Sequence, residues 1–202
     1  MSKPTTNDMI TLKRLGRYLV GKPRLVNCLY SQHTPSDIHC FVDADWAGCV
    51  RTRRSTSGGG IRFGKHMIKA WTGTQASIAL SSGESEYYAL VKGVSQGLGT
   101  QALFLDFGIS VELHVHTDSS AAKGITERVG LGKTRHIAVH LLWIQQHLRR
   151  KTFSLYKVAG DKNPADMFTK HVSEQICQFG MAQWYAEFRC GRSDAAPQSQ
   201  YS

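Results

Sequence analysis

The sequence lacks the features that mark membrane-spanning and secreted proteins. No apolar run approaches the ~18 residues that a membrane-spanning helix needs. The polar N-terminus contains no apolar region of the kind found in secretory signals. The 5 cysteines are odd in number and form no Cys-x-x-Cys motif, which argues against a disulfide framework and against a tetrahedral zinc site. We therefore expect an intracellular protein of the cytoplasm or nucleus that is not secreted and has no membrane partner.

Acidic residues are scarce relative to basic ones. The chain of 202 residues has 15 Asp and Glu against 25 Lys and Arg, which gives a formal net charge of +10 at pH 7. Such a surplus of positive charge indicates a polyanionic partner. The hydrophobic content of 41% is ordinary for a globular protein, and the length suffices for one domain with a full core.

The order of predicted elements indicates an α/β fold with a mixed sheet. Three strands come early and are joined by short connections, so they should be antiparallel, whereas the later strands alternate with helices. The predicted strands cover residues 37–42, 60–64, 67–71, 113–116 and 152–158. The predicted long helices cover residues 8–20, 83–107 and 134–150. A break is expected near Gly97 in the second of them. Asn163-Pro164 is typical of the start of a last helix.

Four acidic residues stand where one predicted element passes to the next. Asp43 and Asp118 end two strands, Glu86 lies in the first turn of the long helix, and Asp166 follows Asn163-Pro164, where the dipole of a helix would help to keep it ionised. Carboxylates at the ends of neighbouring strands converge, and several of them stay ionised only with a cation nearby. Oxygen ligands of this kind suit Mg²⁺ or Mn²⁺. The pattern therefore predicts a metal-dependent phosphodiester-cleaving domain.

Two of these four positions have a close rival. Asp45 is two residues from Asp43 and shares its strand face if the strand continues. The alternating strand pattern ends near Asp43, which favours Asp43 over Asp45. Glu84 competes with Glu86, and its place nearer the helix start suits interaction with the helix N-terminus. Both alternatives stay open at this point.

Six short motifs, in a fixed order, resemble one known family. They occupy residues 42–48, 53–58, 79–87, 117–121, 133–137 and 163–170, and they read VDADWAG, RRSTSG, ALSSGESEY, TDSSA, KTRHI and NPADMFTK. Together they resemble the ribonuclease H domain of the Pol polyprotein of copia-type long-terminal-repeat retrotransposons. The resemblance covers about residues 37–172.

The resemblance implies a fold, an activity and a set of site residues. The fold is the ribonuclease H-like α/β fold, a five-stranded mixed sheet flanked by helices. The activity is endonucleolytic hydrolysis of the RNA strand of RNA–DNA hybrids with Mg²⁺ or Mn²⁺, expected as two ions. Asp43, Glu86, Asp118 and Asp166 match the family's acidic residues, and we expect them to be both catalytic and metal-binding.

The resemblance also implies a domain organisation. Residues 1–36 should be an N-terminal helix and linker from the end of a preceding reverse transcriptase region. Residues 37–172 should form the ribonuclease H-like domain. The sequence pattern itself fades after about residue 173, so residues 173–202 should be a C-terminal tail that is partly disordered. The expected partners are an RNA–DNA hybrid and the reverse transcriptase portion of the same polyprotein.

Basic and hydroxyl-bearing residues near the acids suit contacts with phosphates. Arg53, Arg54, Ser55 and Thr56 lie in a turn soon after Asp43. Lys133 and Arg135 begin the predicted helix over 134–150, where free N–H groups favour anions. We predict that these six residues bind nucleic acid.

Other features leave a second interpretation open. The loop of residues 158–162 has no histidine, a residue that many ribonucleases H carry before the last acid. The alternative is therefore a catalytically decayed module that binds hybrids. His114 and His116 alternate on a predicted strand with Leu113 and Val115, and we interpret them as ordinary strand residues, because the expected metal prefers oxygen.

Overall fold

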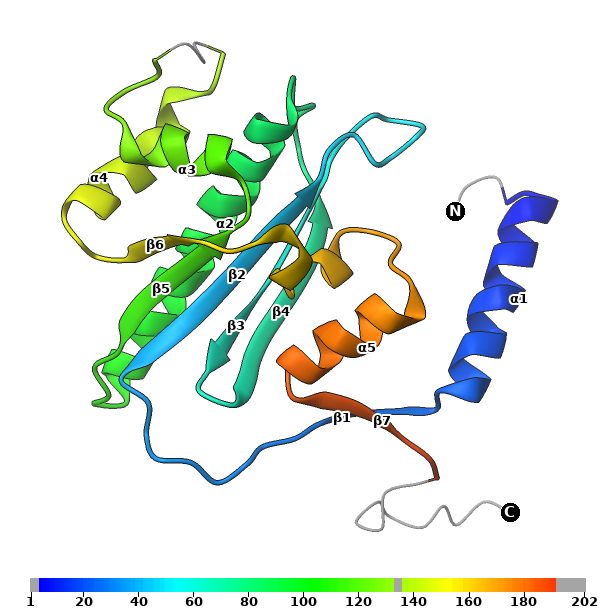
Figure 1. Ribbon diagram of the computed structural model, residues 1–202. Coiled ribbons are helices and arrows are strands. Elements are labelled where there is room, and N and C mark those ends of the chain that lie inside the picture. The colour runs from blue at the N-terminus through cyan, green and yellow to red at the C-terminus, as the bar shows by residue number, and fades with distance from the viewer. Residues whose placement is uncertain (1–3, 133–135, 192–202) are drawn as a thin grey trace.

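A five-stranded mixed sheet forms the centre of the protein (Figure 1) in a computed structural model that describes residues 4–132 and 136–191. The strand order is β4-β3-β2-β5-β6. Strands β2 (Asp37–Asp45), β3 (Thr56–Phe63) and β4 (His66–Thr74) are antiparallel, and β5 (Glu112–Thr117) and β6 (Ser154–Lys157) run parallel to β2. These strand directions and this order define a ribonuclease H-like α/β fold, so the predicted fold class is confirmed.

Helix α2 (Ser82–Asp106) packs along one face of the sheet and forms the main core with it. Strand residues Cys40 and Val42 point to this face, because alternate side chains of a strand share a face. The expected break near Gly97 is wrong: the helix is continuous over 25 residues. A Cβ atom at Gly93 would lie 2.2 Å from Cγ1 of Val42, and one at Gly97 would lie 2.7 Å from Cδ1 of Leu113. These two glycines therefore let the helix approach the strands.

The connection between β5 and β6 is helical but more broken than the sequence predicts. Helix α3 (Ser120–Glu127) starts after Ser119, whose side chain accepts a hydrogen bond from the N–H of Ala122. The predicted helix over 134–150 is a short 3₁₀ turn (Val139–Leu142) followed by α4 (Trp143–Arg149). Ala138, just before the 3₁₀ turn, has an extended backbone that prevents an earlier start.

The opposite face of the sheet is partly covered by the chain that follows β6. This chain contains 3₁₀ turns at Gly160–Lys162 and Asp166–Phe168, then α5 (Glu174–Gln183) and β7 (Ala186–Arg189). Trp184 is buried against Phe41 and Phe168, and its ring N–H donates to the carbonyl of Pro164 at 3.0 Å. The C-terminal part of the described chain is thereby held against the sheet.

No α-helix starts at Asn163-Pro164, contrary to the prediction. The side-chain amide of Asn163 donates to the carbonyl of Val42 at 2.9 Å, and its oxygen accepts from the N–H of Ala165 at 3.2 Å. These bonds fix a tight turn on β2, and only three residues of 3₁₀ helix follow it. The helix dipole proposed for Asp166 is therefore absent.

The N-terminal segment forms a helix and a short strand beside the C-terminal elements. Helix α1 (Thr6–Gly21) is capped by Thr5 and Asp8, and it buries none of its residues. Strand β1 (Arg24–Asn27) pairs antiparallel with β7, and Figure 1 shows both apart from the large sheet. The predicted boundaries at 36 and 172 do not anticipate this pairing, and they stay predictions. No described helix has the length and apolar character needed to cross a membrane.

Candidate active site

Three carboxylates from three elements meet at one edge of the sheet. Asp43 comes from β2, Glu86 from α2 and Asp118 from the residue after β5, and one ligand oxygen of each lies within 4.8 Å of the others. The carboxyl ends of the parallel strands β2 and β5 share this edge, and the first turn of α2 packs over it. Asp43 is fully buried, with 0% of its surface exposed. The structure therefore brings together three of the four predicted acids directly.

The two rival acids take other positions. Glu84 is buried, accepts a hydrogen bond from the N–H of Leu80 at 2.7 Å, and lies 2.9 Å from Nε2 of His136. Glu84 thus holds the start of α2 and does not join the three carboxylates. The side chain of Asp45 folds against the turn at Gly48, where an added Cβ atom would overlap its carboxylate. The geometry thus places Asp43 and Glu86, not Asp45 and Glu84, at the shared edge.

Asp166 joins this group through a basic residue that the sequence reasoning missed. Nζ of Lys170 lies 3.1 Å from Oδ1 of Asp166 and 3.3 Å from Oδ1 of Asp43. The hydroxyl of Thr169 donates to the other carboxylate oxygen of Asp43. Thr169 and Lys170 belong to the motif over 163–170, and the four-residue spacing of Asp166 and Lys170 is the pattern in the sequence that would have pointed to the pair.

Crowding of negative charge changes the ionisation of the site. Burial is the largest cause that raises the pKa of Glu86 to about 9, and the charges of Asp43 and Asp118 add to it. Burial and then the charge of Asp43 also raise the pKa values of Asp118 and Asp166. Lys170 opposes these increases in all three acids. The site therefore holds more negative charge than its own basic residue compensates.

The donor atoms fit a hard divalent cation. Oε2 of Glu86 is buried and has no hydrogen-bond partner among the described residues. A buried carboxylate oxygen without a partner is costly unless an ion or water satisfies it. The converging ligands are all carboxylate oxygens, which Mg²⁺ and Mn²⁺ prefer over nitrogen or sulfur. Asp43, Glu86 and Asp118, with Asp166 beside them, are thus suited to hold such an ion.

The predicted nucleic-acid-binding residues differ in exposure. Arg53 and Arg54 are exposed in the turn between β2 and β3. Ser55 is fully buried, and its hydroxyl accepts a hydrogen bond from the N–H of Ala47 at 3.1 Å, so it shapes the turn from inside. Thr56 is half-buried at the start of β3. Lys133 and Arg135 lie outside the described residues.

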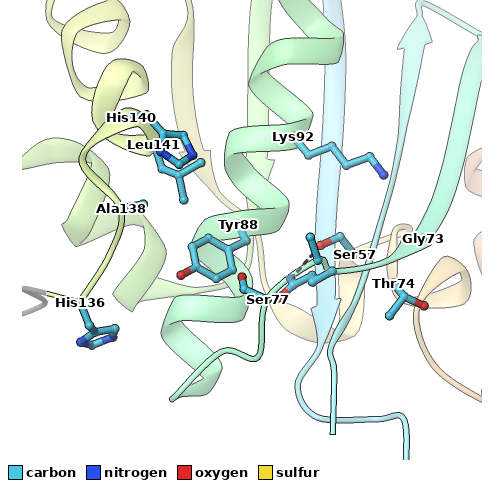
Figure 2. Close-up of a pocket in the computed structure, with 12 residues that line it drawn as sticks. Ser57, Gly73, Thr74, Ser77, Tyr88, Lys92, His136, Ala138, His140 and Leu141 are labelled. Carbon is cyan, nitrogen blue, oxygen red and sulfur yellow. Dashed lines mark hydrogen bonds between the residues drawn. The ribbon is translucent and has the colours of Figure 1, made fainter. Parts of the chain in front are cut away.

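A cavity of about 560 Å³ lies between α2, β3 and the end of β4 (Figure 2). Its walls come from β3, the end of β4, α2 and the segment over 136–141, and Figure 2 shows Lys92 and Tyr88 on the α2 side. The amide of Gln75 donates to the hydroxyl of Ser57 and to the carbonyl of Ser85, both at 2.8 Å. Ser57 pairs with Ala44, the residue after Asp43, but none of the four acids lines the cavity. No sequence pattern singled out Gln75, Tyr88 or Lys92.

Comparison with known proteins gives relatives of one kind over most of the chain. No family model matches. The chain is 27% identical over 174 residues to the retrovirus-related Pol polyprotein from transposon TNT 1-94 of Nicotiana tabacum. The aligned region covers 85% of this chain and 13% of the relative. It is 28% identical over 181 residues to that from transposon RE1 of Arabidopsis thaliana, covering 88% of this chain and 12% of the relative. The chain is a homologue of retrotransposon Pol polyproteins. It spans about an eighth of the length of these relatives.

Solved ribonuclease H structures are also similar to this Pol homologue. LC11-RNase H1, isolated from compost, has a TM-score of 0.47 at 15% identity and covers 66% of this chain and 93% of its own. RNase H1 from the archaeon Halobacterium salinarum has a TM-score of 0.43 at 16% identity and covers 66% and 94%. The order and direction of the strands define the fold of this chain independently of these overlaps.

Proposed function

We propose that this chain is the ribonuclease H domain of a copia-type retrotransposon Pol polyprotein, and that it cleaves the RNA strand of RNA–DNA hybrids. The observation that carries the proposal is the meeting of Asp43, Glu86 and Asp118 within 4.8 Å. These acids come from separate elements and sit partly or fully buried. Folding pays a high electrostatic cost to bring them together, and a bound divalent cation would offset that cost.

The four acids are the metal ligands in this proposal. Asp43, Glu86, Asp118 and Asp166 hold Mg²⁺ or Mn²⁺, in a site suited to two ions. Such an ion supplies a Lewis acid for the phosphate and lowers the pKa of a bound water. Thr169 orients the carboxylate of Asp43 by a hydrogen bond, and Asn163 ties the turn that carries Asp166 to β2.

Hybrid binding follows from charge and shape in this proposal. The net charge of +10 favours a polyanion. Arg53 and Arg54 extend from the turn after β2, and we expect Lys133 and Arg135 to contact phosphates as well. We expect Lys92, which lines the cavity between α2 and β4, to contact a backbone phosphate of the hybrid. An RNA–DNA hybrid is partly A-form, so recognition rests on shape, phosphates and 2′-hydroxyls.

We expect residues 1–36 to connect to a reverse transcriptase partner.

A cleavage assay on matched duplexes tests the proposal. Labelled RNA–DNA, RNA–RNA and DNA–DNA duplexes are incubated with the chain, with and without Mg²⁺. We expect cleavage of the RNA in the hybrid alone and only with Mg²⁺. Asp43→Asn and Asp118→Asn should each lower the cleavage rate by at least about 100-fold. Both residues are proposed as direct metal ligands, and loss of a residue that only supports a ligand already costs about 10- to 100-fold. Asp45→Asn, two residues from Asp43, is the matched control and should keep most activity.

The alternative of a decayed hybrid-binding module predicts a different result. Binding of the hybrid would weaken with salt, as for any phosphate contact, but no Mg²⁺-dependent product would form. Full activity of both Asp43→Asn and Asp118→Asn would reject the assignment of the site.

A further inference from the structure

A second group of metal-ligand side chains lies on the opposite face of the sheet from α2. One ligand atom each of Asp37, His39 and His114 lies within 4.8 Å of the others. Their neighbours Ile38 and Leu113 point into the core under α2, so these three point the other way. The side chains are 33%, 26% and 18% exposed, respectively, which leaves them partly enclosed yet open to an ion.

The group arises from the register of β2 and β5. Asp37 pairs with Glu112, and His39 pairs with His114. Each strand thus carries an acid followed two residues later by histidine, and the two pairs face each other across parallel strands. Oε2 of Glu112 lies 3.4 Å from Nε2 of His114, and Oδ1 of Asp37 lies 3.2 Å from Nε2 of His39. Two imidazoles and the carboxylate of Asp37 therefore border one space, and the exposed side chain of Glu112 lies beside His114.

The partner of His39 suits metal binding. Nδ1 of His39 lies 2.9 Å from Nε2 of His116. When Nδ1 carries the proton and donates it to His116, Nε2 of His39 presents its lone pair to the space beside Asp37. Histidine ligands of metals are commonly oriented by a hydrogen bond from their other ring nitrogen in this way. His116 itself stacks on Phe41, with ring centroids 4.5 Å apart, which holds it in place.

This group is separate from the carboxylates at the other end of β2. Asp43 lies four positions after His39 and six after Asp37 on β2, which corresponds to about 13–20 Å along a strand. The ligand chemistry also differs, because imidazole nitrogen suits transition metals rather than Mg²⁺.

We propose that Asp37, His39 and His114 form a binding site for a divalent transition metal, with Zn²⁺ as the best fit and with water or the neighbouring Glu112 as its fourth ligand. Zn²⁺ takes four ligands in a tetrahedron and accepts histidine nitrogen and carboxylate oxygen. The cysteine pattern argued against a tetrahedral zinc site, but it tests only sites built on cysteine. Bound Zn²⁺ links β2 to β5 and stabilises the start of both strands, a role independent of the cleavage reaction.

Zinc titration of the full chain tests this site. The chain is stripped of metal with EDTA, exchanged into buffer with excess Mg²⁺, and titrated with Zn²⁺ by calorimetry. We expect one equivalent to bind, and the Tm to rise by about 5–10 °C at a free Zn²⁺ concentration of 100 times Kd. Co²⁺ in its place should give the visible absorption bands of a tetrahedral complex. His39→Gln with His114→Gln should lose the equivalent, the Tm rise and the bands.

Control variants separate this site from the carboxylates and from misfolding. Asp43→Asn with Asp118→Asn should still bind the Zn²⁺ equivalent, and so should His33→Gln, which changes an exposed histidine. Asp37→Asn alters a side chain outside the core, so weaker Zn²⁺ binding by this variant cannot be ascribed to loss of the fold. Equal Zn²⁺ binding by the wild type and the double histidine variant would overturn the proposal, as would loss of the equivalent in Asp43→Asn with Asp118→Asn.

Discussion

Nζ of Lys170 lies 3.3 Å from the buried carboxylate of Asp43. The same amine lies 3.1 Å from Asp166, so one positive charge is shared by two acids of the site. The charges of both acids raise the pKa of Lys170 against the opposing effect of burial, so the amine stays protonated at neutral pH. Lys170 therefore supplies part of the positive charge that the converging carboxylates need.

Removal of Lys170 should destabilise the metal-free protein. Lys170→Met leaves Asp43 and Asp166 without their shared cation, and we expect a loss of about 1–2 kcal/mol in the free energy of unfolding. This figure is below that of a fully buried pair because the lysine side chain is 39% exposed. Urea unfolding in EDTA measures this loss of stability. Lys162→Met, at an exposed lysine, is the control. The loss should shrink in excess Mg²⁺, and an equal loss with and without Mg²⁺ would contradict this role.

The raised pKa of Glu86 predicts that the metal-free protein loses stability as pH rises. In the unfolded chain this carboxyl should release its proton near its ordinary pKa of 4.5, whereas the folded protein holds the proton up to about pH 9. Between these values the folded state binds more protons, so the free energy of unfolding falls with pH, by at most about 1.4 kcal/mol per pH unit for one group. The raised pKa values of Asp118 and Asp166 act in the same direction.

Urea unfolding at pH 5 to 9 in EDTA measures this slope. Glu86→Gln cannot ionise, so its stability should fall less steeply than that of the wild type over this range. At pH 8 the variant should be more stable than the wild type by roughly 1–3 kcal/mol, because unfolding of the wild type is favoured by ionisation of the Glu86 carboxyl and the amide of the variant cannot ionise. Identical slopes for the two proteins would show that Glu86 does not titrate as its surroundings imply.

Two glycines of α2 should respond oppositely to the same substitution. Gly93→Ala places a Cβ atom 2.2 Å from Cγ1 of Val42, so we expect a loss of about 1–3 kcal/mol from overpacking. Gly99 has nothing within 4 Å of an added Cβ atom, so Gly99→Ala should gain about 0.5–1 kcal/mol from helix propensity. Thermal and urea unfolding distinguish the two. A stabilising Gly93→Ala would mean that α2 lies further from β2 than described.

Trp184 should connect the C-terminal segment to the stability of the whole domain. It is 1% exposed and packs on Phe41. Trp184→Ala should cost about 3–5 kcal/mol. A chain ending at residue 172, the predicted domain boundary, loses the same contact and should be similarly destabilised relative to one ending at residue 191. Equal stability of the 172-residue chain would support the predicted boundary.

The sequence predicted correctly those features that depend only on local residue patterns and on the order of elements along the chain. Alternation located the strands, and the expected convergence of Asp43 and Asp118 is confirmed. The expected strand end at Asp43 is wrong, because β2 continues to Asp45, whereas Asp118 directly follows β5. The sequence failed where distant contacts decide. The long helix passes Gly97 unbroken because Leu113 packs there, and the turn at Asn163 is held by a bond to Val42. Neither contact can be predicted from the residues that neighbour it in the sequence.

The sequence by itself determined the α/β class, the kinship to Pol polyproteins and the acids that serve as candidates, because these depend on residue types and their order. Only the tertiary structure decided between Glu86 and Glu84, revealed Lys170 beside Asp43, and set His39 opposite His114. The physical reason is that coordination and charge pairing depend on distances of a few ångströms between residues far apart in the chain. Strand register and helix rotation determine these distances.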